Sequence, residues 1–132
     1  MPKRHRVDNA GEDEEKVEGG NGVVRLVHDD RLGARVAIKT HKHHDEDGLS
    51  ADCVREIVLL QHLKGHHPHI VSMEELLVRD GVPSLLMPCA YRPLDEYIGY
   101  PMEDESVQCV HDHLVRATRH LHAHGIVHRD VK

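Results

Sequence analysis

A single predicted helix interrupts a series of β-rich segments in this sequence, and that order restricts the folds open to the chain. Val23–Val27 and Val36–Ile38 are β-rich with a glycine in the connection between them, which predicts two strands joined by a turn. Residues 69–78 and 82–90 predict two further strands, because an Arg-Asp-Gly turn sequence separates them. The charged residues before Gly22 predict only a poor first strand, which completes a set of five.

The interrupting helix is predicted to begin after Ser50, a typical N-cap residue, and to end before Gly65, a typical residue just beyond a helix C-terminus. Its apolar stripe contains one carboxylate followed by leucines at i+3, i+4 and i+7: Glu56, Leu59, Leu60 and Leu63. A carboxylate in a leucine stripe needs an explanation. The simplest is that Glu56 lies at the edge of the stripe and reaches water.

Helical patterns dominate the rest of the sequence. Residues 93–98 predict a short helical piece, and residues 104–124 predict a long amphipathic helix that ends before Gly125. Apolar side chains recur along this second helix at spacings of three and four: Val107, Val110, Leu114, Ala117 and Leu121. Five strands with one inserted helix, followed by further helices, predict an α+β fold.

The composition limits both the core and the partners of the chain. There is no Phe or Trp and there are three Tyr, so the core must consist of Leu, Val, Ile and Met. The net charge of −6 argues against a general nucleic-acid-binding protein. No apolar run approaches the roughly 18 residues of a membrane span, so we expect no membrane association.

The cysteines and the N-terminus indicate where the protein acts. The three cysteines show no paired spacing, and the basic N-terminus is unlike a secretory signal, so we expect a cytoplasmic or nuclear location. Residues 1–16 contain a basic and an acidic cluster with almost nothing apolar, and they predict a disordered tail. The basic run Lys3–Arg6 fits either a short nuclear-import patch or a solvated charge cluster.

Taken in order, several short motifs of this chain resemble those of a protein kinase. They are a glycine-rich stretch ending at Gly22 with Val24 beyond it, VAIK at 36–39, REIVLL at 55–60, HPHIV at 67–71, VPSLLMPCA at 82–90 and HGIVHRDVK at 124–132. VAIK alone is a weak signal, whereas the ordered set is specific. The set covers residues 17–132, and its helix resembles that of cyclin-dependent and related Ser/Thr kinases.

The resemblance implies a kinase-like division of the chain. Residues 17–90 would form the small lobe, a five-stranded antiparallel sheet with one helix, and the hinge. Residues 91–132 would form the first helices of the large lobe, which leaves the fold incomplete.

The resemblance also implies ATP as a cofactor and assigns residues to it. Those in the glycine-rich loop, above the adenine and at the hinge are Val17, Gly19, Gly20, Gly22, Val24, Ala37, Lys39, Met87, Pro88 and Ala90. Glycines let backbone N–H groups approach phosphates, although Val17 stands where the family pattern has its first glycine. The alternatives are a plain hairpin turn for the loop and simple core packing for Met87.

Four residues carry the catalytic roles that the resemblance implies: Asp130, Lys132, Lys39 and Glu56. Lys39 would meet the α- and β-phosphates and pair with Glu56, which explains the carboxylate in the leucine stripe, because an ammonium among apolar strands needs a partner. Asp130 would accept the proton of the substrate hydroxyl, and Lys132 would steady the γ-phosphate. The alternative for Lys39 is an exposed lysine at a strand end.

Four further positions match regulatory residues of the family: Arg129, His128, Leu60 and Met73. Arg129 would meet a phosphorylated activation loop, and the other three match a packed column that aligns the two lobes. The alternative for Arg129 is a surface arginine. The resemblance also implies a protein substrate and a cyclin-like or kinase partner.

The family needs Mg²⁺, and its ligands are absent from these 132 residues. An Asn and an Asp-Phe-Gly would have to follow Lys132 to hold the ions that bridge the phosphates. We therefore expect the front portion of a truncated Ser/Thr kinase, inactive by itself. The alternative is a short non-catalytic, pseudokinase-like module that binds nucleotide or a partner.

The fifteen histidines are explained most simply by composition and solvated loops. They include three sequence groups: His41, His43 and His44; His66, His67 and His69; and His120, His124 and His128. The last three stand four residues apart, but Gly125 interrupts their helix, and His128 already has a place in the kinase motif. We predict no metal site, with a His-rich metal protein as a third alternative.

Overall fold

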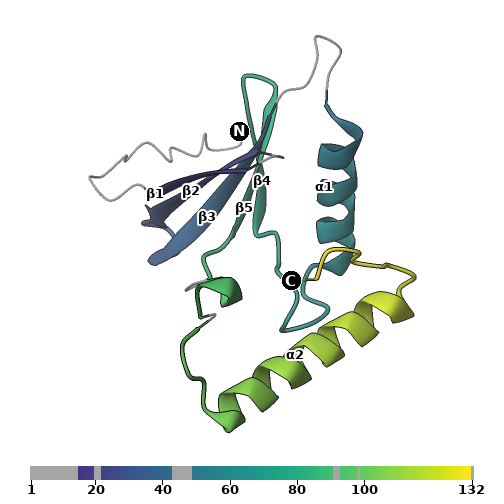
Figure 1. Ribbon diagram of the computed structural model, residues 1–132. Helices are drawn as coiled ribbons and strands as arrows, with labels where there is room; N and C mark the ends of the chain where they lie inside the picture. The colour runs from purple at the N-terminus through teal and green to yellow at the C-terminus, as the bar shows by residue number, and fades with distance from the viewer. Residues whose placement is uncertain (1–14, 20–21, 43–48, 91–92, 98, 132) are drawn as a thin grey trace. The chain divides into compact units, whose positions relative to one another are not determined.

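The computed structural model describes residues 15–19, 22–42, 49–90, 93–97 and 99–131 (Figure 1). The chain divides into two compact units, each with buried apolar side chains of its own. We refer to Met1–His62 with Ser72–Cys89 as the sheet unit, and to Leu63–Val71 with Ala90–Lys132 as the helical unit.

The sheet unit contains a five-stranded antiparallel sheet in the order β1-β2-β3-β5-β4. Its strands are β1 (Glu15–Gly19), β2 (Gly22–Asp29), β3 (Ala34–His41), β4 (Glu75–Arg79) and β5 (Val82–Pro88). In the turn after β2, the backbone N–H groups of Arg31 and Leu32 donate to Asp29 Oδ1 at 2.9 and 3.1 Å, which closes the hairpin. The sheet confirms the architecture that the kinase resemblance implied.

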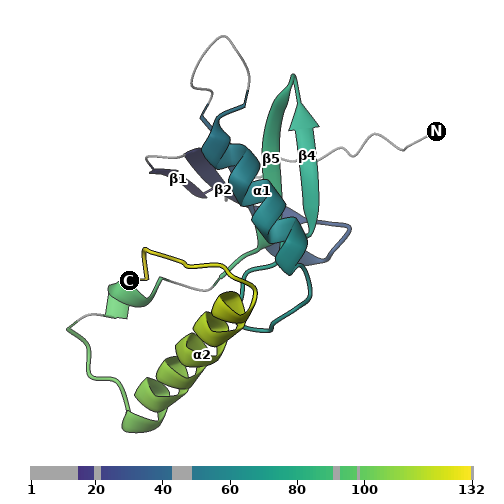
Figure 2. The ribbon, with the colours of Figure 1, turned by 90° about the vertical axis from the view of Figure 1, so that its right-hand side faces the viewer.

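Helix α1 (Ala51–Leu63) has the ends that its sequence predicted. The Cys53 N–H donates to Ser50 Oγ at 3.1 Å, so Ser50 is the N-cap. Gly65 has a φ of 72°, a left-handed conformation that ends a helix at little cost for glycine. Figures 1 and 2 show α1 lying along one face of the sheet.

Two aliphatic clusters form the core of the sheet unit, one on each face of the sheet. On the α1 face the cluster contains Leu60, Met73 and Leu85, with Ile57, Leu76 and Met87 packed against it. On the opposite face it contains Val36, Ile38 and Leu86, with Val27 and Leu77 packed against it. Leu85 and Leu86 are adjacent yet 0% and 1% exposed, because successive side chains of a strand point to opposite faces.

The helical unit contains a short 3₁₀ helix, η1 (Leu94–Tyr97), and the long helix α2 (Asp104–Ala123). Both lie where the sequence predicted helical structure. Beyond the end of α2 the Ile126 N–H donates to the Leu121 carbonyl at 2.9 Å, and Gly125 has a φ of 71°. This is the glycine-assisted C-terminal arrangement that the sequence indicated.

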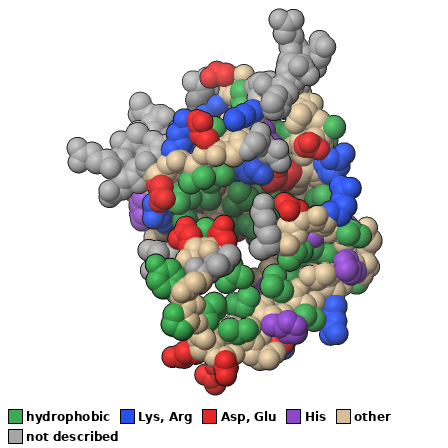
Figure 3. All heavy atoms as spheres, viewed as in Figure 1, with side chains coloured by type: hydrophobic (Ala, Val, Ile, Leu, Met, Phe, Trp, Pro, Cys, Tyr) green, Lys and Arg blue, Asp and Glu red, His purple; other side chains and the backbone are tan. Residues whose placement is uncertain are grey.

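The apolar stripe of α2 is buried only in part. Leu121 is 9% exposed, whereas Val107 and Leu114 are 51% and 44% exposed. Figure 3 shows hydrophobic side chains at the surface around η1 and the start of α2. Among the described helices, none is long and apolar enough to cross a membrane.

Several strand boundaries differ from those predicted, and three of them matter for the site or the tail. β1 includes Glu15 and Lys16, which the sequence placed in the tail, because β2 pairs with them and Arg35 Nη2 donates to Glu15 Oε2 at 3.2 Å. Residues 1–14 lie outside the described part of the chain. β3 continues through His41, which the sequence placed in a loop, and β4 begins only at Glu75, where pairing with β5 begins.

Candidate functional site

An ion pair joins β3 to α1 in the sheet unit. Lys39 Nζ donates to Glu56 Oε1 at 2.7 Å and to Oε2 at 2.8 Å. The two side chains are 22% and 30% exposed, so the pair is neither fully buried nor freely solvated. The sequence predicted that this ammonium and this carboxyl meet, and they do. Their role toward a phosphate stays a prediction.

The environment of Glu56 favours its ionised form. Burial by itself would raise the pKa of the carboxyl, but the hydrogen bonds and charges of Lys39 and His41 outweigh it, and the pKa lies below its ordinary value of 4.5. Glu56 therefore carries its negative charge at neutral pH and holds the Lys39 ammonium in place.

His41 is a third member of this group, which the sequence did not identify. Its Nε2 lies 2.8 Å from Glu56 Oε2, and its side chain is only 6% exposed. The carboxylate accepts, so Nε2 donates, and the buried Nδ1 has no hydrogen-bond partner. The available signal was the spacing: His41 follows Lys39 by two residues, and residues i and i+2 of a strand share a face.

Strand register places further predicted residues on the same face as Lys39. Val24 lies opposite Lys39, and Ala37 lies opposite Met87. Directly opposite residues of antiparallel strands share a face, and so do residues two apart on one strand. Val24, Ala37, Lys39 and Met87 therefore line the face of the sheet on which α1 lies. Val17 joins them, because it lies opposite Val24.

One glycine of the glycine-rich segment, Gly22, is required by the packing of the strands. A Cβ at Gly22 would lie 2.4 Å from the Thr40 carbonyl oxygen, a distance that no side chain tolerates. Close approach of the β2 and β3 backbones thus requires glycine there. Gly19 lies opposite Gly22 in the β1–β2 pairing, and Gly20 lies outside the described residues.

The hinge residues lie at the end of β5 and just beyond it. Met87 packs against the α1-side cluster, which matches the packing alternative for this residue and leaves its role toward ATP a prediction. Pro88 is exposed and lies opposite Val36, and Ala90 is exposed at the start of the helical unit. Two of the regulatory positions, Leu60 and Met73, pack with Leu85 in one cluster.

The HRD sequence lies in the helical unit. His128, Arg129 and Asp130 are all exposed, and the Asp130 N–H donates to His128 Nδ1 at 3.2 Å. Arg129 has a φ of 63°, a left-handed conformation that costs a residue with a side chain about 1–3 kcal/mol. Such strain is concentrated at functional loops. Lys132 lies outside the described residues.

A pocket of about 400 Å³ occurs elsewhere, within the helical unit. Its lining consists of Leu94, Tyr97, Gly99, Tyr100, Met102, Val107 and Val110. None of these residues belongs to the predicted nucleotide site. We therefore identify the candidate site from the Lys39–Glu56 pair and not from this hollow.

The Lys39–Glu56 pair has the chemistry to meet a phosphate group of ATP. An ammonium that is fixed by a carboxylate and still partly exposed can donate to a phosphate oxygen. Mg²⁺ prefers carboxylate, phosphate and water oxygens. Within the described ranges, the group of three or more potential metal ligands that come together consists of histidines, which supply nitrogen and not oxygen ligands.

Comparison with known proteins adds to this geometry. The model of the protein kinase domain matches residues 13–132. The chain is 33% identical over 122 residues to the probable cyclin-dependent kinase 10 of Dictyostelium discoideum. This alignment covers 87% of this chain and 33% of that protein.

Two further relatives give a similar result. Cyclin-dependent kinase G-2 of Oryza sativa subsp. indica is 33% identical over 121 residues, covering 87% of this chain and 17% of the relative. Cyclin-dependent kinase 10 of Homo sapiens is 31% identical over 121 residues, covering 87% of this chain and 33% of the relative. The chain spans about a third or less of the length of these curated relatives.

Proposed function

This chain belongs to the protein kinase family, and from that premise we propose that it supplies the nucleotide-binding part of a Ser/Thr kinase of the cyclin-dependent type. The observation that carries the proposal is the Lys39–Glu56 ion pair, with both oxygens of the carboxylate on one ammonium. Phosphoryl transfer requires a protein mainly to position groups and to balance charge. A fixed ammonium can do both, because it binds a phosphate oxygen in one place and carries a positive charge.

The residues near this pair suggest how ATP would be held. Val24 and Ala37 would lie over the adenine, since register places them on the face that carries Lys39. The Pro88 carbonyl and the Ala90 N–H would meet the adenine edge. The lack of an N–H at Pro88 does no harm, because only its carbonyl is needed.

The residues of the HRD motif would act on the substrate. Asp130 would orient the substrate hydroxyl and accept its proton, and Lys132 would steady the γ-phosphate. Arg129 would bind a phosphorylated residue of an activation segment. Protein substrates and a cyclin-like partner belong to this proposal, since the relatives are named cyclin-dependent kinases.

A polypeptide limited to these 132 residues would bind nucleotide without transferring phosphate. Magnesium supplies the charge that balances the phosphates during transfer, and the Asn and the Asp-Phe-Gly that hold it in the family would have to follow Lys132. This favours, for the polypeptide alone, the second candidate function of a non-catalytic nucleotide-binding module.

Thermal unfolding of the 132-residue chain with and without ATP tests the proposal. ATP should raise the melting temperature of the wild type, and Lys39→Met should remove most of that rise. Lys42→Met is the matched control, because Lys42 is exposed and follows the same strand. An equal ATP effect in both variants, or none in a folded wild type, would contradict nucleotide binding at Lys39.

A phosphate-transfer assay tests the second statement. We expect no labelled phosphate to reach a library of Ser- and Thr-containing peptides from the 132-residue polypeptide, even with Mg²⁺ present. Transfer that Asp130→Asn abolishes would show that these residues are sufficient for catalysis and that the inactivity proposal is wrong.

A further inference from the structure

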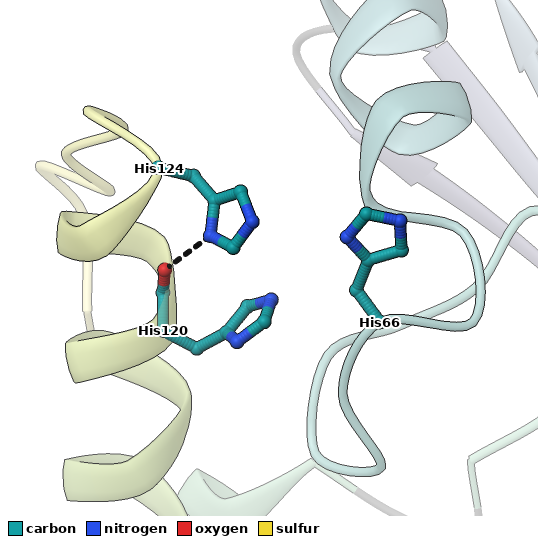
Figure 4. Close-up of side chains that lie close together, drawn as sticks. All are labelled: His66, His120 and His124. Atoms are coloured by element: carbon teal, nitrogen blue, oxygen red, sulfur yellow. Dashed lines mark hydrogen bonds between the residues drawn. The ribbon is translucent and has the colours of Figure 1, made fainter.

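Three histidines of the helical unit converge on one point, and none of them belongs to the proposed nucleotide site. His66 lies in the connection after α1, His120 in the last turn of α2, and His124 directly after it. Figure 4 shows the three imidazole rings turned toward one another. One potential ligand atom from each residue lies within 4.8 Å of the other two. We propose that His66, His120 and His124 bind a divalent transition-metal ion, with Zn²⁺ as the expected ion.

The separation of the rings suits a metal after a small closure. Zinc binds imidazole nitrogen at about 2.0–2.1 Å, so two nitrogens on a tetrahedral zinc lie roughly 3.3 Å apart. Nitrogens within 4.8 Å of one another need to approach by no more than about 1.5 Å. His66 and His124 are exposed side chains, and rotation about their side-chain torsions can supply that movement.

The His124 ring already makes the kind of hydrogen bond that orients histidines in metal sites. His124 Nδ1 lies 2.8 Å from the His120 carbonyl oxygen, so Nδ1 carries the proton and donates it (Figure 4). This bond fixes the tautomer and leaves Nε2 with the lone pair. Histidines that bind metals almost always donate their other ring N–H to a carbonyl or carboxylate in this way.

The second ring has a nitrogen for which the protein provides no partner. His120 Nε2 is buried and makes no hydrogen bond. Buried polar atoms are rarely left without a partner, and each such atom in a native structure needs an explanation. A metal ion between the three rings would satisfy this nitrogen.

The surroundings keep His120 suited to ligation. Burial, followed by the charges of His124, His67 and His66, lowers the pKa of His120, which favours the neutral imidazole. The neutral form is the one that binds metals.

The ligands select the class of ion. Imidazole nitrogen suits Zn²⁺, Cu²⁺ and Ni²⁺, whereas Ca²⁺ and Mg²⁺ take oxygen ligands. Three protein ligands leave a fourth position of a tetrahedral zinc for water or for His67, whose ring centre lies 5.1 Å from that of His120. The ion would tie the connection after α1 to the end of α2 within the helical unit.

Metal retention by the untagged 132-residue chain tests the site. The protein is loaded with ZnCl₂, dialysed against metal-free buffer and analysed for zinc by mass spectrometry. We expect one retained zinc per chain in the wild type, and at least a tenfold loss of retained zinc in His66→Gln and in His124→Gln. Both residues are exposed, so the variants should fold.

His113→Gln is the matched control. His113 lies on α2 and stacks on His69 with ring centres 3.7 Å apart, so it belongs to a histidine pair outside the proposed site. It should retain zinc like the wild type. Loss of zinc in His113→Gln with retention in His66→Gln, or no retained zinc in the wild type, would overturn the proposal.

Cobalt gives a readout that does not depend on the variants. Co²⁺ bound to the wild type should show the visible absorption bands of a four-coordinate site, and one equivalent of Zn²⁺ should displace it. A spectrum that stays that of hydrated Co²⁺ would equally overturn the site. Neither result bears on ATP binding, so this test and the nucleotide test fail independently.

Discussion

Glu56 is the side chain on which the candidate nucleotide site most depends, because it serves two partners. It accepts from Lys39 through both oxygens and from His41 through Oε2. Both partners are largely enclosed, with side chains 22% and 6% exposed. Removing the carboxylate leaves an ammonium and an imidazole facing each other without a compensating charge.

Replacing Glu56 with Gln should therefore destabilise the sheet unit. We expect a loss of about 1–2 kcal/mol in the free energy of unfolding, more than for a surface ion pair and less than for a fully buried one. Urea unfolding followed by circular dichroism measures it. Glu103→Gln, at an exposed carboxylate before α2, should change stability by less than about 0.5 kcal/mol. Equal losses in the two variants would show that the ion pair contributes nothing.

The same pair predicts a pH dependence of stability. Because the pKa of Glu56 is lowered below 4.5 on folding, its contribution is fully present above that value and is lost as the pH falls through the folded pKa. The stability difference between wild type and Glu56→Gln should have its full size at pH values well above 4.5 and should shrink in acid. A difference that stays constant down to pH 3 would show that the carboxyl titrates normally.

Among the strands, the β2–β3 pair depends on a close backbone contact at Gly22. Gly22→Ala would place a Cβ 2.4 Å from the Thr40 carbonyl oxygen and force the two strands apart. We expect a loss of about 1–3 kcal/mol in the free energy of unfolding, as for other overpacked sites. Thermal and urea unfolding measure this loss.

Gly19→Ala is the matched control for that experiment. A Cβ at Gly19 meets nothing closer than the Gly22 carbonyl oxygen at 4.0 Å, so stability should be nearly unchanged. If Gly22→Ala is as stable as Gly19→Ala, the glycine at position 22 has no structural role. The phosphate explanation for that glycine would then gain support.

Helix α2 carries buried and exposed apolar residues on one stripe, and they should differ in their effect on stability. Leu121→Ala removes a side chain that is 9% exposed and should cost about 2–3 kcal/mol. Val107→Gln replaces a side chain that is 51% exposed with a better helix former and should be neutral within about 0.5 kcal/mol. Urea unfolding distinguishes the two. A large loss in Val107→Gln would show that this end of the stripe is covered.

Local chemistry predicted the helices well and the strand ends poorly. Ser50, Gly65 and Gly125 mark helix ends through their own hydrogen bonds and backbone angles, so the sequence alone reveals them. β1 consists of exposed residues and exists because β2 offers it a partner. Such strand pairing is non-local, and the residue types of Glu15 and Lys16 do not predict it.

The residues of the candidate site were also predicted only in part. Lys39 and Glu56 could be predicted because a family motif fixes both positions. His41 was missed because its neighbours in sequence are polar, so β3 was not predicted to continue through it and its spacing of two from Lys39 was not used. His66 was grouped with its sequence neighbours, whereas the two histidines it lies close to, His120 and His124, lie in the last turn of α2 and directly after it.

For the chain as a whole, the position of its tyrosines allows the two units to be followed separately. The three tyrosines lie at 91, 97 and 100, all within the helical unit, and there is no tryptophan. Among the described residues of that unit, the buried apolar side chains are Leu63 and Leu121. We therefore expect tyrosine fluorescence to report unfolding at lower urea than hydrogen exchange of the backbone amides of β3 and β5. Superimposable curves would show that the units unfold together.

Strand β5 limits where the sheet unit can accept inserted or deleted residues. It lies between β3 and β4, and its adjacent residues Leu85 and Leu86 fill the clusters on opposite faces. One inserted or deleted residue would turn each leucine to the wrong side and misalign both neighbouring strands at once. The sheet unit can therefore accept insertions and deletions in its turns but not within β5, because the length of this strand sets the alignment of both neighbouring strands.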